Sequence, residues 1–197
     1  MKKSFAAAMT AALMLFLLSG ACAPLNEFVK YAAGPTYPRY GNDALNLPGL
    51  SEPVLVYYDP GGVPHIEARN LKDLLRANGF VQSRDRFFAM DAMRRIAAGR
   101  MSELVGERDM LDSSTVEFDL AMRGWGMDEA AAGDVERMDA EERELMEAYV
   151  AGINYALEVF VPMEYRLLQI NPEPWRIEDS FLLGRLIAWS VTHNFHQ

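Results

Sequence analysis

The chain has 197 residues, of which 50% are hydrophobic, and a formal net charge of -9. This composition is typical of a globular domain and excludes a disordered chain. The acidic charge argues against nucleic acid as a partner, because phosphate backbones bind basic surfaces. The only cysteine, Cys22, has no second cysteine with which to form a disulfide.

Residues 1–22 have the pattern of an export signal. Lys2 and Lys3 precede an apolar run over residues 6–18, and small residues then lead to Cys22. The apolar run is too short to span a bilayer comfortably. We therefore predict an exported protein, located in the periplasm or anchored to a membrane as a lipoprotein.

Two hypotheses remain for Cys22. In the first, residues 18–22 are an imperfect lipobox and Cys22 becomes a lipidated first residue, which would need more than one acyl chain for stable membrane anchoring. In the second, residues 21–23 are an A-x-A cleavage site, and Cys22 leaves with the signal peptide. The sequence is compatible with both.

An extended segment and a β-hairpin are expected next. Residues 23–50 are rich in proline and lack periodicity, so we predict a tether. Residues 54–58 are β-branched or aromatic, residues 59–62 read Asp-Pro-Gly-Gly, and residues 65–68 are a second predicted strand. This pattern predicts a two-stranded hairpin joined by a tight turn.

Residues after the hairpin are predicted to be helical, so the fold class is α+β and mainly helical. Asn70 is a candidate cap for a helix beginning at Leu71. Gly79 should bend or break that helix, and a longer helix should then continue to about Leu104. Residues 107–137 predict short helices and loops.

Three further helices are expected towards the C-terminus. Asp139 and Glu142 form a capping box for a helix that Pro162 stops. A short helix is predicted over residues 163–170. A last helix is predicted over residues 178–193, where acidic residues in the first turn suit the helix dipole.

Four charged residues share one arc of the helix that follows Gly79. Asp91 lies three and four residues before Arg94 and Arg95, which is the spacing for ion pairs, and Arg84 lies on the same arc. Because buried arginines need partners, we predict an internal ion network that locks this helix against its neighbours. The functional alternative is an anion site made by Arg84 and Arg94.

The chain from Val54 to its C-terminus resembles the α chain of penicillin acylases, which are N-terminal-nucleophile hydrolases. Several pieces carry this resemblance, in family order and at family-like spacing. They are Gly62-Val-Pro-His-Ile66, the segments 79–91 and 94–106, Asp119 with Arg123, Ala148-Tyr-Val-Ala-Gly-Ile-Asn154, Pro162-Met-Glu-Tyr-Arg-Leu-Leu168, Pro174-Trp175 with Asp179-Ser180, and Ala188-Trp-Ser-Val-Thr-His-Asn194. One departure is Arg176-Ile177, where the family often has a capping hydroxyl and a proline.

The resemblance implies an αββα enzyme made as an exported precursor several times longer than this chain. Self-cleavage would expose a serine at the start of a β chain, and the α-amino group of that serine would act as its own base. We therefore expect no catalytic residue here, a fragment (residues 51–197) truncated before the nucleophile, and the β chain of the same precursor as partner. Calcium is expected in the full-length enzyme, but no metal ligand or cofactor in this chain.

The implied reaction is hydrolysis of an N-acyl amide: a β-lactam side chain, an acyl-homoserine lactone or a similar small molecule. In the family, the end of the last α-chain helix helps to line the acyl pocket. By position, the substrate-binding candidates are Trp189, Thr192, His193 and Phe195. The alternative is that Trp189 belongs to the core and that His193 and His196 are exposed at a frayed end.

A second function hypothesis is a non-catalytic helical lipoprotein that uses this fold for binding, or a relic of the family. The sequence contains none of the short motifs of zinc proteases, phosphate-binding loops or serine-hydrolase elbows. Those classes are therefore not supported as alternatives.

Overall fold

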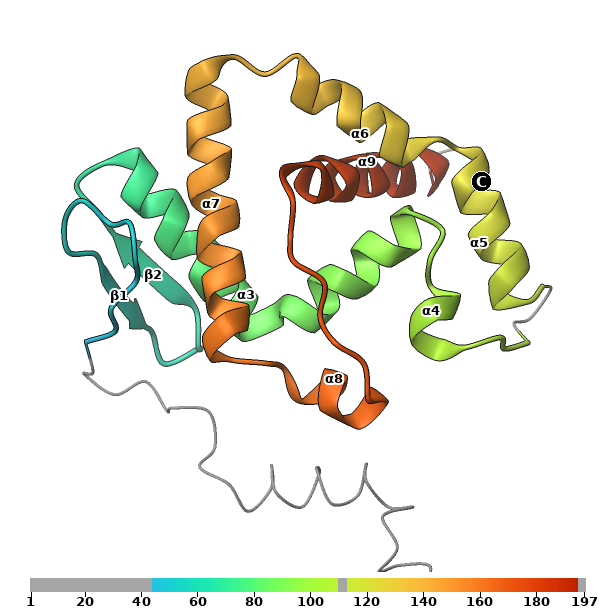
Figure 1. Ribbon diagram of the computed structural model, residues 1–197, viewed down its shortest axis with the longest axis horizontal. Coiled ribbons are helices and arrows are strands. Elements are labelled where there is room, and N and C mark those ends of the chain that lie inside the picture. Colours follow the sequence, from blue (N-terminus) through green and yellow to red (C-terminus); the bar gives the residue numbers. More distant parts are fainter. Residues whose placement is uncertain (1–43, 110–112, 195–197) are drawn as a thin grey trace, which may run out of the picture. The chain divides into compact units, whose positions relative to one another are not determined.

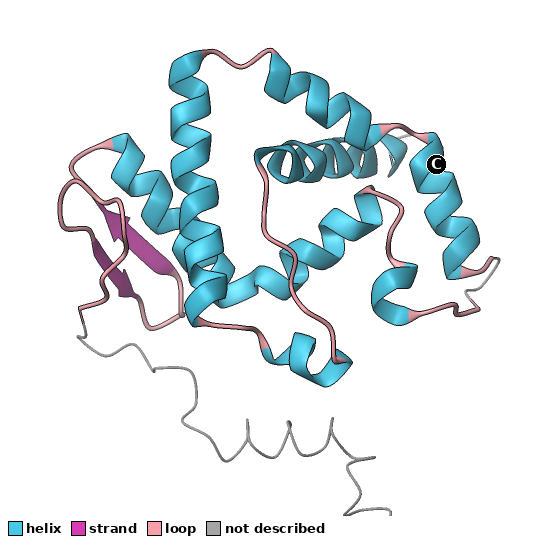
Figure 2. Ribbon diagram, viewed as in Figure 1, coloured by secondary structure: helices cyan, strands magenta, loops and turns pink. Residues whose placement is uncertain are grey.

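The computed structural model describes residues 44–109 and 113–194. They form a mainly helical structure with a two-stranded antiparallel hairpin near its N-terminal end, as predicted (Figures 1 and 2). Of these residues, 163–171 belong to one compact unit and all the others to a second. The predicted signal segment, Cys22, most of the tether and Phe195 lie outside the described residues.

The elements follow the predicted order. They are β1 (Leu55–Tyr58), β2 (Pro64–Glu67), α3 (Leu71–Ala97), α4 (Ser102–Val105), α5 (Thr115–Gly124), α6 (Met127–Glu136), α7 (Ala140–Val159), α8 (Met163–Leu168) and α9 (Ile177–Asn194). Helix α8 lies in the smaller unit. None of the described helices combines the length and the apolarity that a bilayer crossing requires.

The hairpin matches its prediction to within one residue at each strand. Tyr57 pairs with His65 across the two strands, and their rings stack 4.9 Å apart. Asp59 organises the turn, because its Oδ1 accepts hydrogen bonds from the backbone N–H groups of Gly61 and Val63, each at 2.9 Å. Gly62 supplies the left-handed conformation at φ 78°.

Helix α3 begins at its predicted cap. The Asn70 side chain accepts a 2.8 Å hydrogen bond from the backbone N–H of Asp73. The Asp73 carboxylate is itself buried and accepts bonds from the backbone and hydroxyl of Ser51 and the backbone of Glu52. Burial raises the pKa of Asp73, but the hydrogen bonds led by Ser51 outweigh it and hold this pKa below its ordinary value. The segment before β1 is thereby attached to the first turn of α3.

The prediction that Gly79 bends or breaks the helix is wrong. The helix continues through Gly79, and the single irregular residue is Arg86, at φ -146° and ψ 18°. A Cβ atom on Gly79 would lie less than 3.0 Å from the backbone carbonyl of Tyr149 in α7, and one on Gly152 equally close to the carbonyl of Arg76. The two glycines therefore allow the backbones of α3 and α7 to touch.

Helix α3 also ends earlier than predicted, at Ala97 and not near residue 104. Gly99 adopts φ 62°, which turns the chain out of the helix. The buried Asp119 carboxylate then accepts the backbone N–H groups of Met101 and Ser102, at 2.8 and 2.9 Å, and so supports the start of α4. The backbone after the end of α3 is thus held by a residue from α5, and the sequence around residue 97 gives no sign of that contact.

The capping boxes define the following helices. Ser114 with Glu117 caps α5, and Asp139 with Glu142 caps α7 as predicted. Apolar residues then gather in two buried clusters of the larger unit. One contains Leu47, Ala77, Phe80, Val81 and Ala156, and the other contains Ala97, Met122, Met127, Ala131, Leu182 and Leu186.

Candidate functional site

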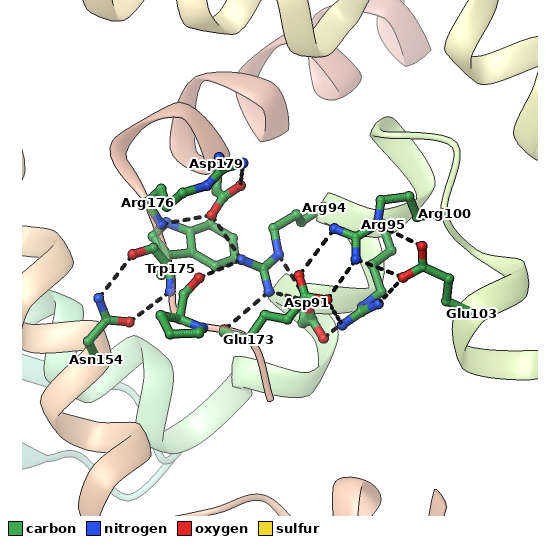
Figure 3. A network of polar contacts seen from close by, with 11 residues as sticks. Asp91, Arg94, Arg95, Arg100, Glu103, Asn154, Glu173, Trp175, Arg176 and Asp179 are labelled. Atoms are coloured by element: carbon green, nitrogen blue, oxygen red, sulfur yellow. Dashed lines mark hydrogen bonds and ion pairs between the residues drawn. The ribbon is translucent and has the colours of Figure 1, made fainter. Parts of the chain in front are cut away.

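A buried carboxylate lies at the centre of the predicted ion network (Figure 3). Asp91 is fully buried; its Oδ1 accepts the Nε of Arg94 at 2.9 Å, and its Oδ2 accepts the Nε of Arg95 at 3.1 Å. These are the i,i+3 and i,i+4 pairs that the spacing indicated. The prediction of an internal network is confirmed.

Arg94 carries this network from α3 to the start of α9. Its Nη1 donates to the Asp179 carboxylate at 2.8 Å and to the carbonyl of Pro174 at 3.1 Å. Its guanidinium also lies over the Trp175 ring, 5.0 Å from the ring centroid. Burial lowers the pKa of Arg94, but the charges of Asp179 and Asp91 outweigh this effect and raise it above its ordinary value.

The alternative of an anion site shared by Arg84 and Arg94 is not supported. Every guanidinium nitrogen of Arg94 donates to an acceptor of the chain itself. Arg84 instead bonds to Asp85 and to the hydroxyl of Tyr58 at the hairpin. Each arginine therefore binds its own set of acceptors within the chain, and the two do not share a site.

The outer side of the network joins α3 to α4 and to the segment before α9. Arg95 pairs with Glu103 at 2.6 Å and with Glu173 at 3.1 Å, and Arg100 pairs with both carboxylates (Figure 3). The hydrogen bond from Arg100 is the main cause that lowers the pKa of Glu173. The hydrogen bonds to Glu103 and Glu173 correspondingly raise the pKa of Arg100.

The first turn of α9 is held from two sides. The Asn154 side chain in α7 bonds to both backbone polar groups of Trp175, at 2.7 and 2.9 Å, and the indole N–H of Trp175 donates to Ser180. Asp179 accepts the backbone N–H of Arg176 at 2.7 Å, which is the half of a capping box that the acidic residue supplies; a hydroxyl at 176 would supply the other half. The start of α9 is thus fixed to both α3 and α7.

Three of the four candidate substrate-binding residues, Trp189, Thr192 and His193, lie at the opposite end of α9. Trp189 is partly buried against the cluster of Leu182 and Leu186, and its ring meets Trp125 edge to face, with centroids 5.9 Å apart. Thr192 is exposed, and its hydroxyl donates to carbonyls of its own helix. His193 belongs to α9, but its side chain, like Phe195, lies outside what the structure describes. The pocket assignment therefore stays a prediction for all four residues.

Trp125 had no predicted role, yet the structure places it beside Trp189. It follows α5 in a turn between two glycines, and 59% of its surface is exposed. The signal in the sequence was weak: a tryptophan between glycines identifies a turn, but not what its ring contacts. The same end of α9 exposes Ile187 and Val191, one helical turn apart.

Four buried aspartates accept hydrogen bonds that hold the fold together. Asp73, Asp91, Asp119 and Asp179 are all buried and all accept hydrogen bonds from the chain. No three His, Cys, Asp or Glu residues of the described part are placed to share a metal ion. We therefore derive no step through the calcium ion that the resemblance implied for the full-length enzyme.

Comparison with known proteins identifies the family. The penicillin amidase family model matches residues 53–197. The chain belongs to the penicillin amidase family. Its acylase relatives place it in a hydrolase family.

Two relatives show the range of names within the family. The chain is 42% identical over 147 residues to the penicillin acylase 2 proenzyme of Pseudomonas sp. (strain SE83), covering 74% of this chain and 18% of that protein. It is 31% identical over 154 residues to the acyl-homoserine lactone acylase QuiP of Pseudomonas putida, covering 77% and 18%. The chain therefore spans about a fifth of the length of these relatives.

The fold is also that of a solved acylase. A structure of the thermostable penicillin G acylase from Alcaligenes faecalis matches with a TM-score of 0.59 and 26% identity. The match covers 68% of this chain and 70% of the matched chain, so the two chains are of nearly equal length.

Proposed function

We propose that this chain is the α-chain part of a longer, exported enzyme that hydrolyses N-acyl amide bonds. The observation that carries the proposal is its 42% identity with a penicillin acylase proenzyme of which it spans 18%. In this proposal the present chain contributes to substrate binding. The nucleophile lies in the remaining part of the precursor, outside this chain. The relatives' names include penicillin and acyl-homoserine lactone acylases, so both acyl classes are candidate substrates.

The partner in this proposal is the β chain of the same precursor. Two findings support a two-chain enzyme: one relative is named a proenzyme, and the matched chain of the solved acylase has nearly the length of this one. The free α-amino group of a β-chain serine, cysteine or threonine would act as base for its own side chain, because such an amine titrates near neutral pH.

The contribution of this chain would be to position α9. The ion network and Asn154 hold the first turn of α9 against two other helices. The helix then extends for 18 residues and ends at the candidate acyl-binding residues. A helix fixed at its start can hold a binding wall at its end, which lowers the entropic cost of ordering the substrate.

Export and anchoring are part of the proposal. The basic segment, apolar run and small residues before Cys22 support cleavage between residues 20 and 23. Mass spectrometry of the mature N-terminus distinguishes an acylated Cys22 from a start after residue 23. Retention of Met1 in the cell envelope contradicts both. Calcium in the full-length enzyme would be held by groups outside this chain.

The decisive experiment starts from the complete gene. We expect a coding sequence that continues beyond codon 197, and a product that cleaves itself into two chains with Ser, Cys or Thr first on the second. The processed protein should hydrolyse phenylacetyl amides or acyl-homoserine lactones. The 197-residue chain alone should hydrolyse neither, because it lacks the nucleophile.

Three outcomes would contradict parts of this proposal. Turnover by the 197-residue chain alone would place the nucleophile inside it. A stop codon directly after codon 197, with a monodisperse and cooperatively melting product, would favour the non-catalytic binding protein or relic. A processed two-chain protein without activity on any N-acyl compound would refute the reaction.

A further inference from the structure

An aromatic pair, of which one ring is exposed, connects the end of α5 with α9. Trp125 and Trp189 meet edge to face, at 5.9 Å between ring centroids and 63° between ring planes. Trp189 is partly buried and packs against the cluster formed by α3, α5, α6 and α9, whereas 59% of Trp125 is exposed. The orientation of Trp189 is therefore supported both by the core and by Trp125.

Trp125 is presented on a fixed turn. Its backbone N–H donates to the carbonyl of Met122 at 3.1 Å, and that of Gly126 donates to the carbonyl of Arg123 at 3.0 Å. Gly126 adopts φ 60°, which other residues adopt only with strain. Arg123 is itself held by the carbonyl of Gly99 at 2.9 Å. A large ring on such a turn needs little further ordering when it binds a ligand.

We propose that Trp125 and Trp189 form one aromatic wall for the acyl group of the substrate, and that Trp125 is a specificity-determining residue of this wall. This inference rests on the proposed function, since the acyl group is the ligand that the family names supply. Two indole rings at this angle offer an apolar, π-rich surface, which favours a flat aromatic acyl group over a flexible aliphatic one.

The kinetic test compares two acyl groups in the processed, full-length protein. Trp125→Leu should lower kcat/KM for a phenylacetyl amide about tenfold and for an octanoyl amide less than about threefold, because only the flat ring loses its stacking partner. The loss should appear mainly in KM, since Trp125 does not touch the reacting bond. Trp125→Phe should restore most of the preference.

A matched control separates this effect from a general loss of structure. Leu120 is an equally exposed apolar residue, at 60%, on α5, the helix that Trp125 follows. Leu120→Ala should change neither kcat/KM value by more than about twofold, which is the ordinary range for a surface substitution. Equal losses on both substrates for Trp125→Leu would show a structural role and overturn the inference.

A fluorescence test gives an answer that does not depend on turnover. The difference in acrylamide quenching between the protein and its Trp125→Phe variant reports how accessible Trp125 is. We expect an accessible ring that phenylacetate protects from quenching and that octanoate protects less. An inaccessible ring before any acid is added would show that other polypeptide covers it, and an accessible ring that phenylacetate leaves unprotected would show a plain surface residue. Either result overturns the inference, even in a protein whose reaction differs from the one proposed.

Discussion

The two halves of α3 are attached to the rest of the domain by different physical means. Before Arg86, Gly79 lets the backbone of α3 lie directly on α7, opposite Gly152. After Arg86, Asp91 and Arg94 bind charged partners as far away as α9. The contact of the first half with α7 depends on the absence of side-chain volume, and that of the second half with α9 on the balance of buried charges.

Because of this difference, different kinds of substitution should destabilise the two halves of α3. Backbones in contact cannot accept even one methyl group without moving apart, because protein interiors are close-packed. Buried ion pairs accept changes of volume more readily, but the loss of one partner leaves an uncompensated charge in an apolar environment. Variants that change only volume or only charge can therefore test the comparison.

The largest effect is expected from removing the central charge. Asp91→Asn keeps the shape of the side chain but leaves Arg94 and Arg95 without their shared carboxylate. We expect a loss of about 3–5 kcal/mol in the free energy of unfolding, measured by denaturant titration. Glu144→Gln is the control, because it removes one charge from the exposed pair with Lys72 and should have far less effect. Similar losses for both variants would contradict a special role for burial.

The next largest effect is expected at the helix contact. Gly152→Ala adds a methyl group where a Cβ would lie less than 3.0 Å from the backbone of Arg76. Backbone atoms cannot rotate away as side-chain ends can, so α3 and α7 must separate. We expect a loss of about 3 kcal/mol, measured by thermal or denaturant unfolding. A neutral result would mean that the two backbones do not touch in solution.

A smaller and pH-dependent effect is expected at Asp73. The pKa of Asp73 in the folded state lies below its ordinary value of 3.8, so its ionised form stabilises the fold. Asp73→Asn should cost about 2 kcal/mol near neutral pH, because hydrogen bonds to a charged group are lost. This contribution is complete above the ordinary pKa and is lost as the pH falls through the lower folded-state value.

The measurement for Asp73 is the difference in unfolding free energy between the two proteins along a pH series. The difference should be constant from about pH 7 to about pH 5 and should shrink below about pH 4, where the unfolded chain takes up the proton first. If the difference in unfolding free energy grew as the pH fell, the ionised form of Asp73 would not be the stabilising one.

The smallest effect is expected to be a gain. Gly184 lies within α9, and a Cβ there would meet no atom within 4 Å. Gly184→Ala should stabilise the fold by about 0.5–1 kcal/mol in denaturant unfolding, because alanine favours helix and no described contact opposes it. The same chemical change at Gly152 should destabilise, so the pair isolates the effect of the helix contact from that of helix propensity. A loss at Gly184 would indicate that this face of α9 is already covered.

Local rules predicted the parts of this protein that depend on neighbours in sequence. The cap at Asn70, the capping box of Asp139 with Glu142, and the pairing of Asp91 with Arg94 and Arg95 each involve residues within four positions of one another. Backbone geometry places such residues together in any helix, so their spacing is sufficient information.

The parts that sequence reasoning missed depend on distant partners. Gly79 read alone is a helix breaker, and only the backbone of Tyr149, from α7, shows it to be a contact residue. In the candidate site, Trp189 was named from its position, but Trp125 came into view only when the fold placed the two rings together.

The sequence by itself determined the family, the hairpin followed by helices, and the local charge pairs, because each is encoded in short patterns. The tertiary structure decided which distant residues come into contact. It joined Arg94 to Asp179 across 85 positions of the chain. It also turned Gly79 into a helix contact and placed Trp125 on Trp189. Long-range contacts form only when the buried surfaces of several helices pack at once, and no local pattern contains that condition.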